Sequence, residues 1–78
     1  MTNTKLLREI IADKGLKLTY IAKELGISRF SLSKKIKNDN EFLPSEINKL
    51  CKILGITNSK MKVKIFLEES SQEGNEQT

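Results

Sequence analysis

The sequence predicts an all-α domain, folded as a bundle of four to five short helices. Leucine and isoleucine recur three and four residues apart along much of the chain, which places them on one face of a helix. Glycines, or clusters of asparagine and aspartate, end these segments at short intervals, as helix stops do. The chain has 78 residues, enough for one small domain, and local helix packing is an economical way to build so small a core.

The first two helices are expected at residues 4–14 and 18–25. In the first, one face holds Leu6, Leu7, Ile10 and Ile11. In the second, the same spacing brings together Leu18, Ile21, Ala22 and Leu25. Gly15 and Gly26 directly follow these segments, and glycine readily adopts the left-handed conformation that closes a helix. Each helix is therefore expected to end at its glycine.

A third helix is expected at residues 28–37. Ser28 is a strong N-cap residue, because its hydroxyl accepts a hydrogen bond from a free backbone N–H of the first turn. Leu32 and Ile36 lie four residues apart and form the inner face, and the cluster NDN at residues 38–40 ends the helix. The segment also carries four basic residues, Arg29, Lys34, Lys35 and Lys37.

The fourth helix, residues 44–54, lies in the segment LPSEINKLCKILGI. Pro44 suits a first helical turn, where its missing N–H costs nothing. Glu46 suits the positive N-terminal end of the helix dipole. The apolar stripe consists of Ile47, Leu50, Cys51 and Leu54. Gly55 marks the end of the helix.

Residues 58–67 leave two alternatives. Asn58 or Ser59 could cap a fifth helix, whereas KMKVKIFL alternates apolar and basic residues as an edge strand would. We favour the helix. Residues 68–78 are polar and acidic, and we predict a disordered tail that follows a folded domain of residues 1–67.

The charges are unevenly distributed along the chain. The net charge is +4, but residues 1–67 contain fourteen basic and six acidic residues, whereas residues 68–78 contain four glutamates and no basic residue. A basic body with an acidic tail favours a polyanionic partner, nucleic acid first and an anionic membrane surface second.

The composition argues against an enzyme or a metalloprotein. The chain has no histidine and a single cysteine, so it cannot form an internal disulfide, and neither a zinc site nor an activated thiol has its usual partners. We expect Cys51 to be buried in its helix, and we expect no cofactor. No apolar run is long enough for a signal peptide or a transmembrane helix, and we expect a reducing, cytoplasmic location.

The second and third expected helices are joined by the short sequence LGIS, residues 25–28. A turn this short between crossed helices needs a residue with positive φ, which Gly26 can supply. Ala22 is small at the point where the two helices must approach each other. The arrangement predicts a helix-turn-helix, in which the second helix is presented outward to the major groove of DNA.

The order LLREIIADKGLKLTYIAKELGISRFSLSKKI, followed by EINKLCKILGI, resembles the Cro and lambda-repressor-like family, also called Xre-type helix-turn-helix domains. The resemblance spans about residues 6–56, and IAKELGIS followed by SLSKKI is its most specific part. It implies a lambda-repressor-like bundle that binds double-stranded operator DNA. The segment EFLPSEINKLCKILGI looks most similar to small regulators of phages and prophages of low-GC Gram-positive bacteria.

The resemblance also implies which residues meet DNA. Base edges would be read by Arg29, Phe30, Ser33 and Lys34. The phosphate backbone would be held by Lys17, Tyr20, Ser28, Lys35, Lys37 and Asn38. Phe30 can meet a thymine methyl group or instead cover the preceding turn, and Tyr20 is as readily a packing residue. Relatives often have Ser or Thr and then Gln where this chain has Lys17 and Leu18, so the usual amide–phosphate contact is missing.

The function implied is that of a transcription regulator, Cro-like or repressor-like, which performs no chemistry. Family members commonly bind two half-sites as dimers, and the candidate dimer surface holds Met61, Val63, Phe66 and Leu67. The alternative is a protein-interaction module: a phage antirepressor or co-repressor that grips a partner repressor, or an antitoxin whose tail folds on a toxin. No membrane partner is expected.

Overall fold

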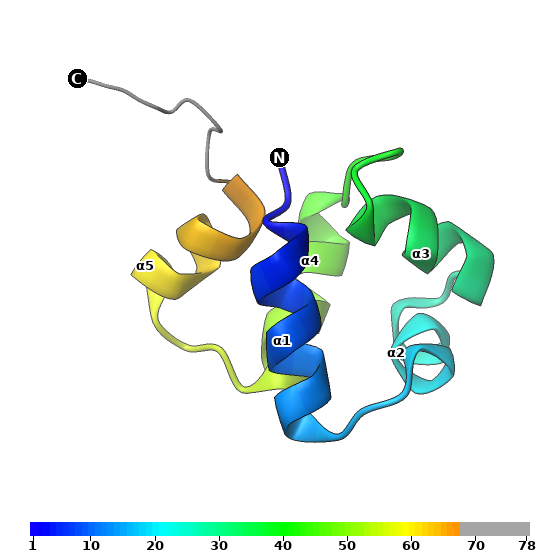
Figure 1. The fold of residues 1–78 in the computed structure, drawn as a ribbon, viewed down its shortest axis with the longest axis horizontal. Coiled ribbons are helices and arrows are strands. Elements are labelled where there is room, and N and C mark those ends of the chain that lie inside the picture. The colour runs from blue at the N-terminus through cyan, green and yellow to red at the C-terminus, as the bar shows by residue number, and fades with distance from the viewer. Residues whose placement is uncertain (68–78) are drawn as a thin grey trace.

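A computed structural model describes residues 1–67 of the chain, and every regular element within them is a helix (Figure 1). In order, these are α1 (Thr4–Lys14), α2 (Leu18–Leu25), α3 (Arg29–Ile36), α4 (Pro44–Leu54), α5 (Ser59–Lys62) and a π-helical turn, η1 (Val63–Leu67). The prediction of an all-α bundle is confirmed. The acidic tail predicted for residues 68–78 lies outside the described residues.

The segment that allowed two interpretations is helical. Asn58 caps α5 by accepting a hydrogen bond from the backbone N–H of Lys60 at 2.7 Å, and η1 continues the same helix. We call residues 59–67 the last helix. Its Ile65 and Phe66 are buried, and the Phe66 ring meets Phe42 edge-to-face with 5.6 Å between the ring centres. Burial of two adjacent apolar residues excludes the alternating pattern of an edge strand for this segment.

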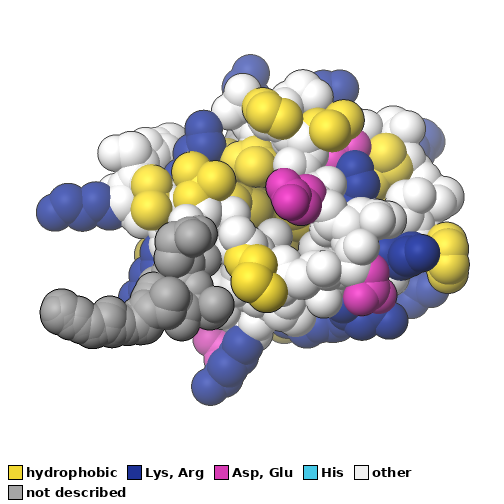
Figure 2. Space-filling model, turned by 90° about the horizontal axis from the view of Figure 1, so that it is seen from above, with side chains coloured by type: hydrophobic (Ala, Val, Ile, Leu, Met, Phe, Trp, Pro, Cys, Tyr) yellow, Lys and Arg dark blue, Asp and Glu magenta, His cyan; other side chains and the backbone are white. Residues whose placement is uncertain are grey.

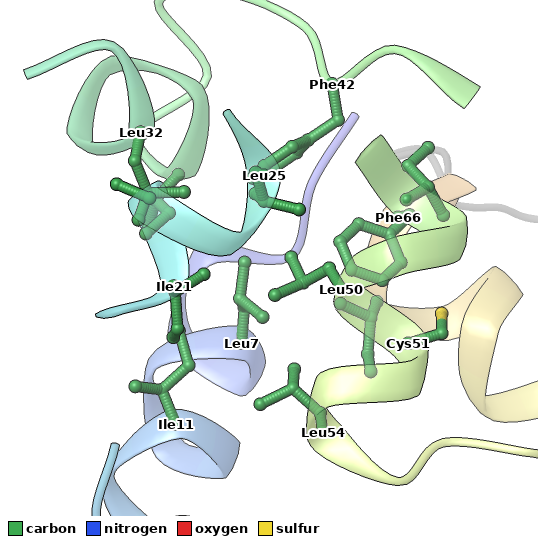
Figure 3. Close-up of a cluster of buried hydrophobic side chains, with 14 residues drawn as sticks. Leu7, Ile11, Ile21, Leu25, Leu32, Phe42, Leu50, Cys51, Leu54 and Phe66 are labelled. Atoms are coloured by element: carbon green, nitrogen blue, oxygen red, sulfur yellow. The ribbon is translucent and has the colours of Figure 1, made fainter. Parts of the chain in front are cut away.

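One hydrophobic core joins all the helices (Figure 3). Its fully buried side chains are Leu7, Ile21, Leu32, Ile36, Leu50, Leu54 and Ile65. Leu7 of α1 and Leu50 of α4 point toward each other near its centre. The core residues therefore come from the inner faces that the helical spacing predicts for the first four helices.

Three helices end in the same way, with a glycine in the left-handed conformation. Gly26 has φ 75° and ψ 27°, and the following residue, Ile27, donates its N–H to the Ala22 carbonyl at 3.0 Å. This hydrogen bond closes a Schellman motif, which also places an apolar side chain under the last turn. Ile27 is half-buried against the core in that position. The turn between α2 and α3 is consequently short and fixed.

The end of α3 uses asparagine where the other helices use glycine. Asn38 has φ 68°, and the next residue, Asp39, donates its N–H to the Lys34 carbonyl at 2.8 Å. The Asn38 side chain then bonds Thr2 twice: its carbonyl oxygen accepts from the Thr2 N–H at 2.8 Å, and its amide donates to the Thr2 carbonyl at 2.9 Å. Asparagine tolerates this conformation better than most residues, and the contact with Thr2 holds it there.

The N-terminal residues connect α3 to the last helix. The Thr4 hydroxyl donates a hydrogen bond to the Ile36 carbonyl, at the end of α3. The Asn3 N–H donates to the Ile65 carbonyl at 2.6 Å, and the Asn3 side chain caps α1 by accepting from the Leu6 N–H. The start of the chain therefore fixes the C-terminal end of α3 against the rest of the bundle.

Candidate nucleic-acid interface

The helix-turn-helix is formed by α2 and α3, which pack on each other at the edge of the bundle (Figure 1). Ala22 and Leu25 of α2 are buried at the turn, with 2% and 6% of their surface exposed. A small residue at this place lets the two helices cross closely. As a result, α3 packs against α2 and the core on its inner side and is exposed to solvent on its outer side.

Local and core contacts both fix α3. The Ser28 hydroxyl accepts a hydrogen bond from the Ser31 N–H at 3.0 Å, which is the N-cap that the sequence predicts. Leu32 and Ile36 are fully buried one turn apart. Because α3 has only eight residues, these two anchors determine which of its side chains face outward.

The outer face of α3 presents Arg29, Phe30, Ser33, Lys34 and Lys37. Phe30 is 73% exposed, so it points to solvent and does not cover the preceding turn. The Lys34 ammonium lies over the Phe30 ring, 5.4 Å from its centre, and this cation–π contact explains why Lys34 is half-buried. Arg29 and Lys37 are exposed. The aromatic ring and three cations thus lie on a surface that faces away from the core.

Lys35, adjacent to Lys34, has a different environment. Its ammonium forms an ion pair with the Glu46 carboxylate, and the two side chains are only 13% and 8% exposed. Within residues 1–67 this is the only ion pair. Lys35 therefore joins α3 to the start of α4, and the structure gives its charge a partner inside the protein. Lys35 is therefore not among the residues that we propose to contact the DNA backbone.

Glu46 makes a second contact, because its carboxylate also accepts the Leu43 N–H at 2.9 Å and so caps α4. Burial acts to raise the pKa of Glu46, but the hydrogen bonds from Lys35 and Leu43, together with the Lys35 charge, outweigh it. The pKa is therefore below its usual 4.5, and the carboxylate is ionised at neutral pH. The sequence predicts Glu46 at the helix N-terminus but carries no signal for its pairing with Lys35.

Among the other residues expected to contact the DNA backbone, some are exposed to solvent and one uses its side chain inside the protein. Lys17 and Tyr20 are exposed at the start of α2, where Lys17 occupies the N-cap position without a side-chain cap hydrogen bond. The first-turn N–H groups of α2 and the Lys17 ammonium can therefore act together on an anion. Asn38, by contrast, uses its side-chain amide on Thr2.

The expected dimer surface on the last helix is only partly exposed. Met61, Val63 and Leu67 are 38%, 49% and 53% exposed, but Phe66 is 3% exposed and belongs to the core. Phe66 is not available on this surface as expected, because the last helix turns its ring inward onto Phe42. Figure 2 shows apolar side chains spread over the face of the molecule that is seen from above.

Cys51 is a core residue. Burial raises the pKa of its thiol, and the charge of nearby Lys62 opposes this only in part, so the thiol is protonated at neutral pH. A protonated, buried thiol is a poor nucleophile. No three side chains among His, Cys, Asp and Glu gather as a metal-binding group anywhere in residues 1–67.

Comparison with known families identifies the family to which the chain belongs. Residues 6–59 match the Cro/C1-type helix-turn-helix DNA-binding domain, and the match covers the whole of α2 and α3. The protein belongs to this family, whose members are non-enzymatic DNA-binding regulators. Searches of curated proteins and of solved structures give no significant match. Over residues 1–67, no helix is both long and apolar enough to cross a membrane.

Proposed function

We propose that the protein is a sequence-specific regulator of transcription that reads operator DNA with α3 in the major groove. The observation that carries this proposal is the division of α3 into two sides. Leu32 and Ile36 are fully buried, while Arg29 and Phe30 are exposed beside Lys34. A B-DNA major groove admits one α-helix, and base edges there present acceptors that cations can recognise.

Each outer side chain has a chemically suitable contact. Arg29 and Lys34 can donate to the O6 and N7 atoms of guanine, and Phe30 can pack on the methyl group of thymine. The stacking of Lys34 on Phe30 would hold the ammonium in one position before DNA arrives. Ser33 lies one turn from Arg29 and can either donate or accept a hydrogen bond.

Contacts with the backbone would flank the base contacts. Ser28 is the N-cap of α3 and Lys37 is its C-cap. Lys17 is the N-cap of α2, and Tyr20 lies in the first turn of that helix. Phosphate contacts from such positions set the register of the protein on DNA without reading sequence. The set excludes Lys35 and Asn38, whose polar groups are used inside the protein.

The test is a titration of the purified protein with fragments from the neighbourhood of its own gene, and with a scrambled control. We expect one fragment to be preferred, and Arg29→Ala to lower that preference by a factor that corresponds to about 1–3 kcal/mol. Lys23→Ala, an exposed cation on α2, is the matched control and should retain the preference. Equal and weak binding to every fragment by the parent would contradict sequence reading.

We further propose that the protein binds its operator as a dimer, through the exposed side of the last helix. Met61, Val63 and Leu67 are large apolar side chains exposed on that helix, and a contiguous apolar patch marks a protein contact. To bind two half-sites one turn of DNA apart, such a dimer would have to present its two α3 helices about 34 Å apart. Whether such a dimer acts as a Cro-like protein or as a repressor depends on the operator.

Sedimentation of the full chain tests the dimer. The substitution Val63→Glu should convert a dimer to a monomer, while Lys60→Glu, exposed on the same helix, should not. A parent that sediments as a monomer, free and on DNA, would contradict the dimer. If it also bound DNA tightly only with a second protein, the function would instead be that of an antirepressor, a co-repressor or an antitoxin.

A further inference from the structure

We propose that residues 68–78 of this chain dock across the outer face of α3 and compete with DNA for it. The docking half of this proposal stands on the geometry and charge of the chain itself, and the competition half rests on the function proposed above. Three observations support it: where the last helix ends, how far eleven residues reach, and how the charges are distributed.

The end of the last helix and the C-terminal end of α3 border the same surface hollow. Leu67, its final residue, lines a surface hollow of about 380 Å³ together with Asn38, the residue that closes α3. Phe42 and Phe66, whose rings are in contact, line the same hollow. The chain therefore leaves the described fold next to the helix that we assign to the DNA, although the two segments are about thirty residues apart in sequence.

The outer face of α3 is within reach from this point. Eleven residues can span at most about 36 to 40 Å, since a fully extended chain covers no more than about 3.3–3.6 Å per residue. A helix of eight residues is about 12 Å long. A segment of eleven residues, when extended, is thus about three times as long as α3, which is long enough to cross the hollow and follow the helix.

The charges are complementary. Residues 68–78 contain Glu68, Glu69, Glu73 and Glu76 and no basic residue. From Arg29 to Lys37 the chain contains four basic residues and no acid. One of the four, Lys35, is paired with Glu46, which leaves Arg29, Lys34 and Lys37 without an ion-pair partner within residues 1–67. A row of carboxylates would meet these cations as a row of phosphates does.

Intramolecular attachment makes even a weak contact of this kind effective. A short linker gives an attached segment an effective concentration on the order of millimolar. The segment would weaken binding to operator and to non-operator DNA by about the same factor. Non-operator DNA binds more weakly at the outset, so it would be released first. Docking would therefore leave non-operator DNA unbound at protein concentrations that still fill the operator, without changing the ratio of the two affinities.

The experiment uses the full chain with two carboxylates neutralised, Glu73→Gln with Glu76→Gln. Its matched control neutralises two exposed acids on α1, Glu9→Gln with Asp13→Asn, which raises the net charge by the same two units. The affinity for a non-operator duplex at low salt is measured for each. We expect the first pair to tighten binding about fivefold and the control pair less than about twofold, because only the first removes a competitor held at millimolar concentration.

Docking is checked separately, without DNA, by the amide NMR shifts of the parent and of a variant with all four glutamates changed to Gln. We expect the shift differences to concentrate in residues 29–37 and to vanish at high salt, where charges are screened. Equal effects of the two charge pairs on affinity, or shift differences absent from α3, would overturn the proposal. Because the NMR comparison needs no DNA, its outcome does not depend on whether α3 reads an operator.

Discussion

The two sides of α3 place neighbouring lysines in opposite environments. Lys34 lies on the outer side, stacked on the exposed ring of Phe30. Lys35 lies on the side that faces α4, where Glu46 takes its charge and little of either side chain is exposed. One lysine is available to a partner, and the other holds two helices of the bundle together. A count of basic residues on a helix therefore does not measure its binding surface.

The difference has a physical origin in the helix period. Successive residues are turned by about 100° around a helix, so one step along α3 moves a side chain from solvent to the neighbouring helix. A lysine on the inner flank is acceptable only with a partner, since a buried unpaired charge is costly. Glu46 is that partner, and it is fixed in turn by the Leu43 N–H that it caps.

The largest expected effect on stability comes from a substitution on the inner side of α3. Replacing the fully buried Leu32 by Ala should lower the free energy of unfolding by about 2–5 kcal/mol, because it removes a side chain and leaves a cavity. Urea denaturation followed by far-UV circular dichroism measures the change. Lys37→Ala on the exposed side should stay within about 0.5 kcal/mol of the parent. Equal losses for both would contradict the division of α3 into two sides.

A smaller effect is expected at the ion pair and depends on pH. Glu46→Gln retains an acceptor for the Leu43 N–H but leaves Lys35 without its charge partner, which should cost about 1–3 kcal/mol at pH 7. Because the folded state lowers the pKa of Glu46, its carboxylate stabilises the fold above the usual value of 4.5. This stabilisation is lost as the pH falls below that value through the lower folded pKa.

The stability difference between the parent and Glu46→Gln should therefore be largest at neutral pH and shrink on acidification. Urea midpoints measured across that range give the curve. The exposed Glu24→Gln serves as the control and should differ little from the parent at any pH. A difference that is constant with pH would show that the charge of Glu46 does not stabilise the fold.

The sequence predicts the elements better than the contacts between them. Helical spacing and the stops at Gly15, Gly26 and Gly55 are local signals, and the helices end where these residues lie. The inner face of α3 follows from Leu32 and Ile36 in the same way. Such features need only the residues within one or two turns, which a sequence displays directly.

Contacts that join distant segments could not be predicted in this way. Lys35 and Glu46 are eleven residues apart across a loop, and Asn38 meets Thr2 thirty-six residues away. Only the packed fold brings these groups together. Phe66 illustrates the same limit, since the mixed pattern of residues 60–67 fits more than one helical phase and the π-turn decides which side chains face the core.

The claim that α3 reads base sequence is tested most directly by two variants on its outer side, Lys34→Ala and Lys37→Ala. Their binding is measured to the preferred fragment and to copies of it with single base-pair changes. Lys34→Ala should relax discrimination at one position by about 1–3 kcal/mol. Lys37→Ala should instead weaken binding to all copies alike and reduce the salt slope by about one. Uniform weakening by both would contradict the account, because α3 would then be an electrostatic surface and not a reader of sequence.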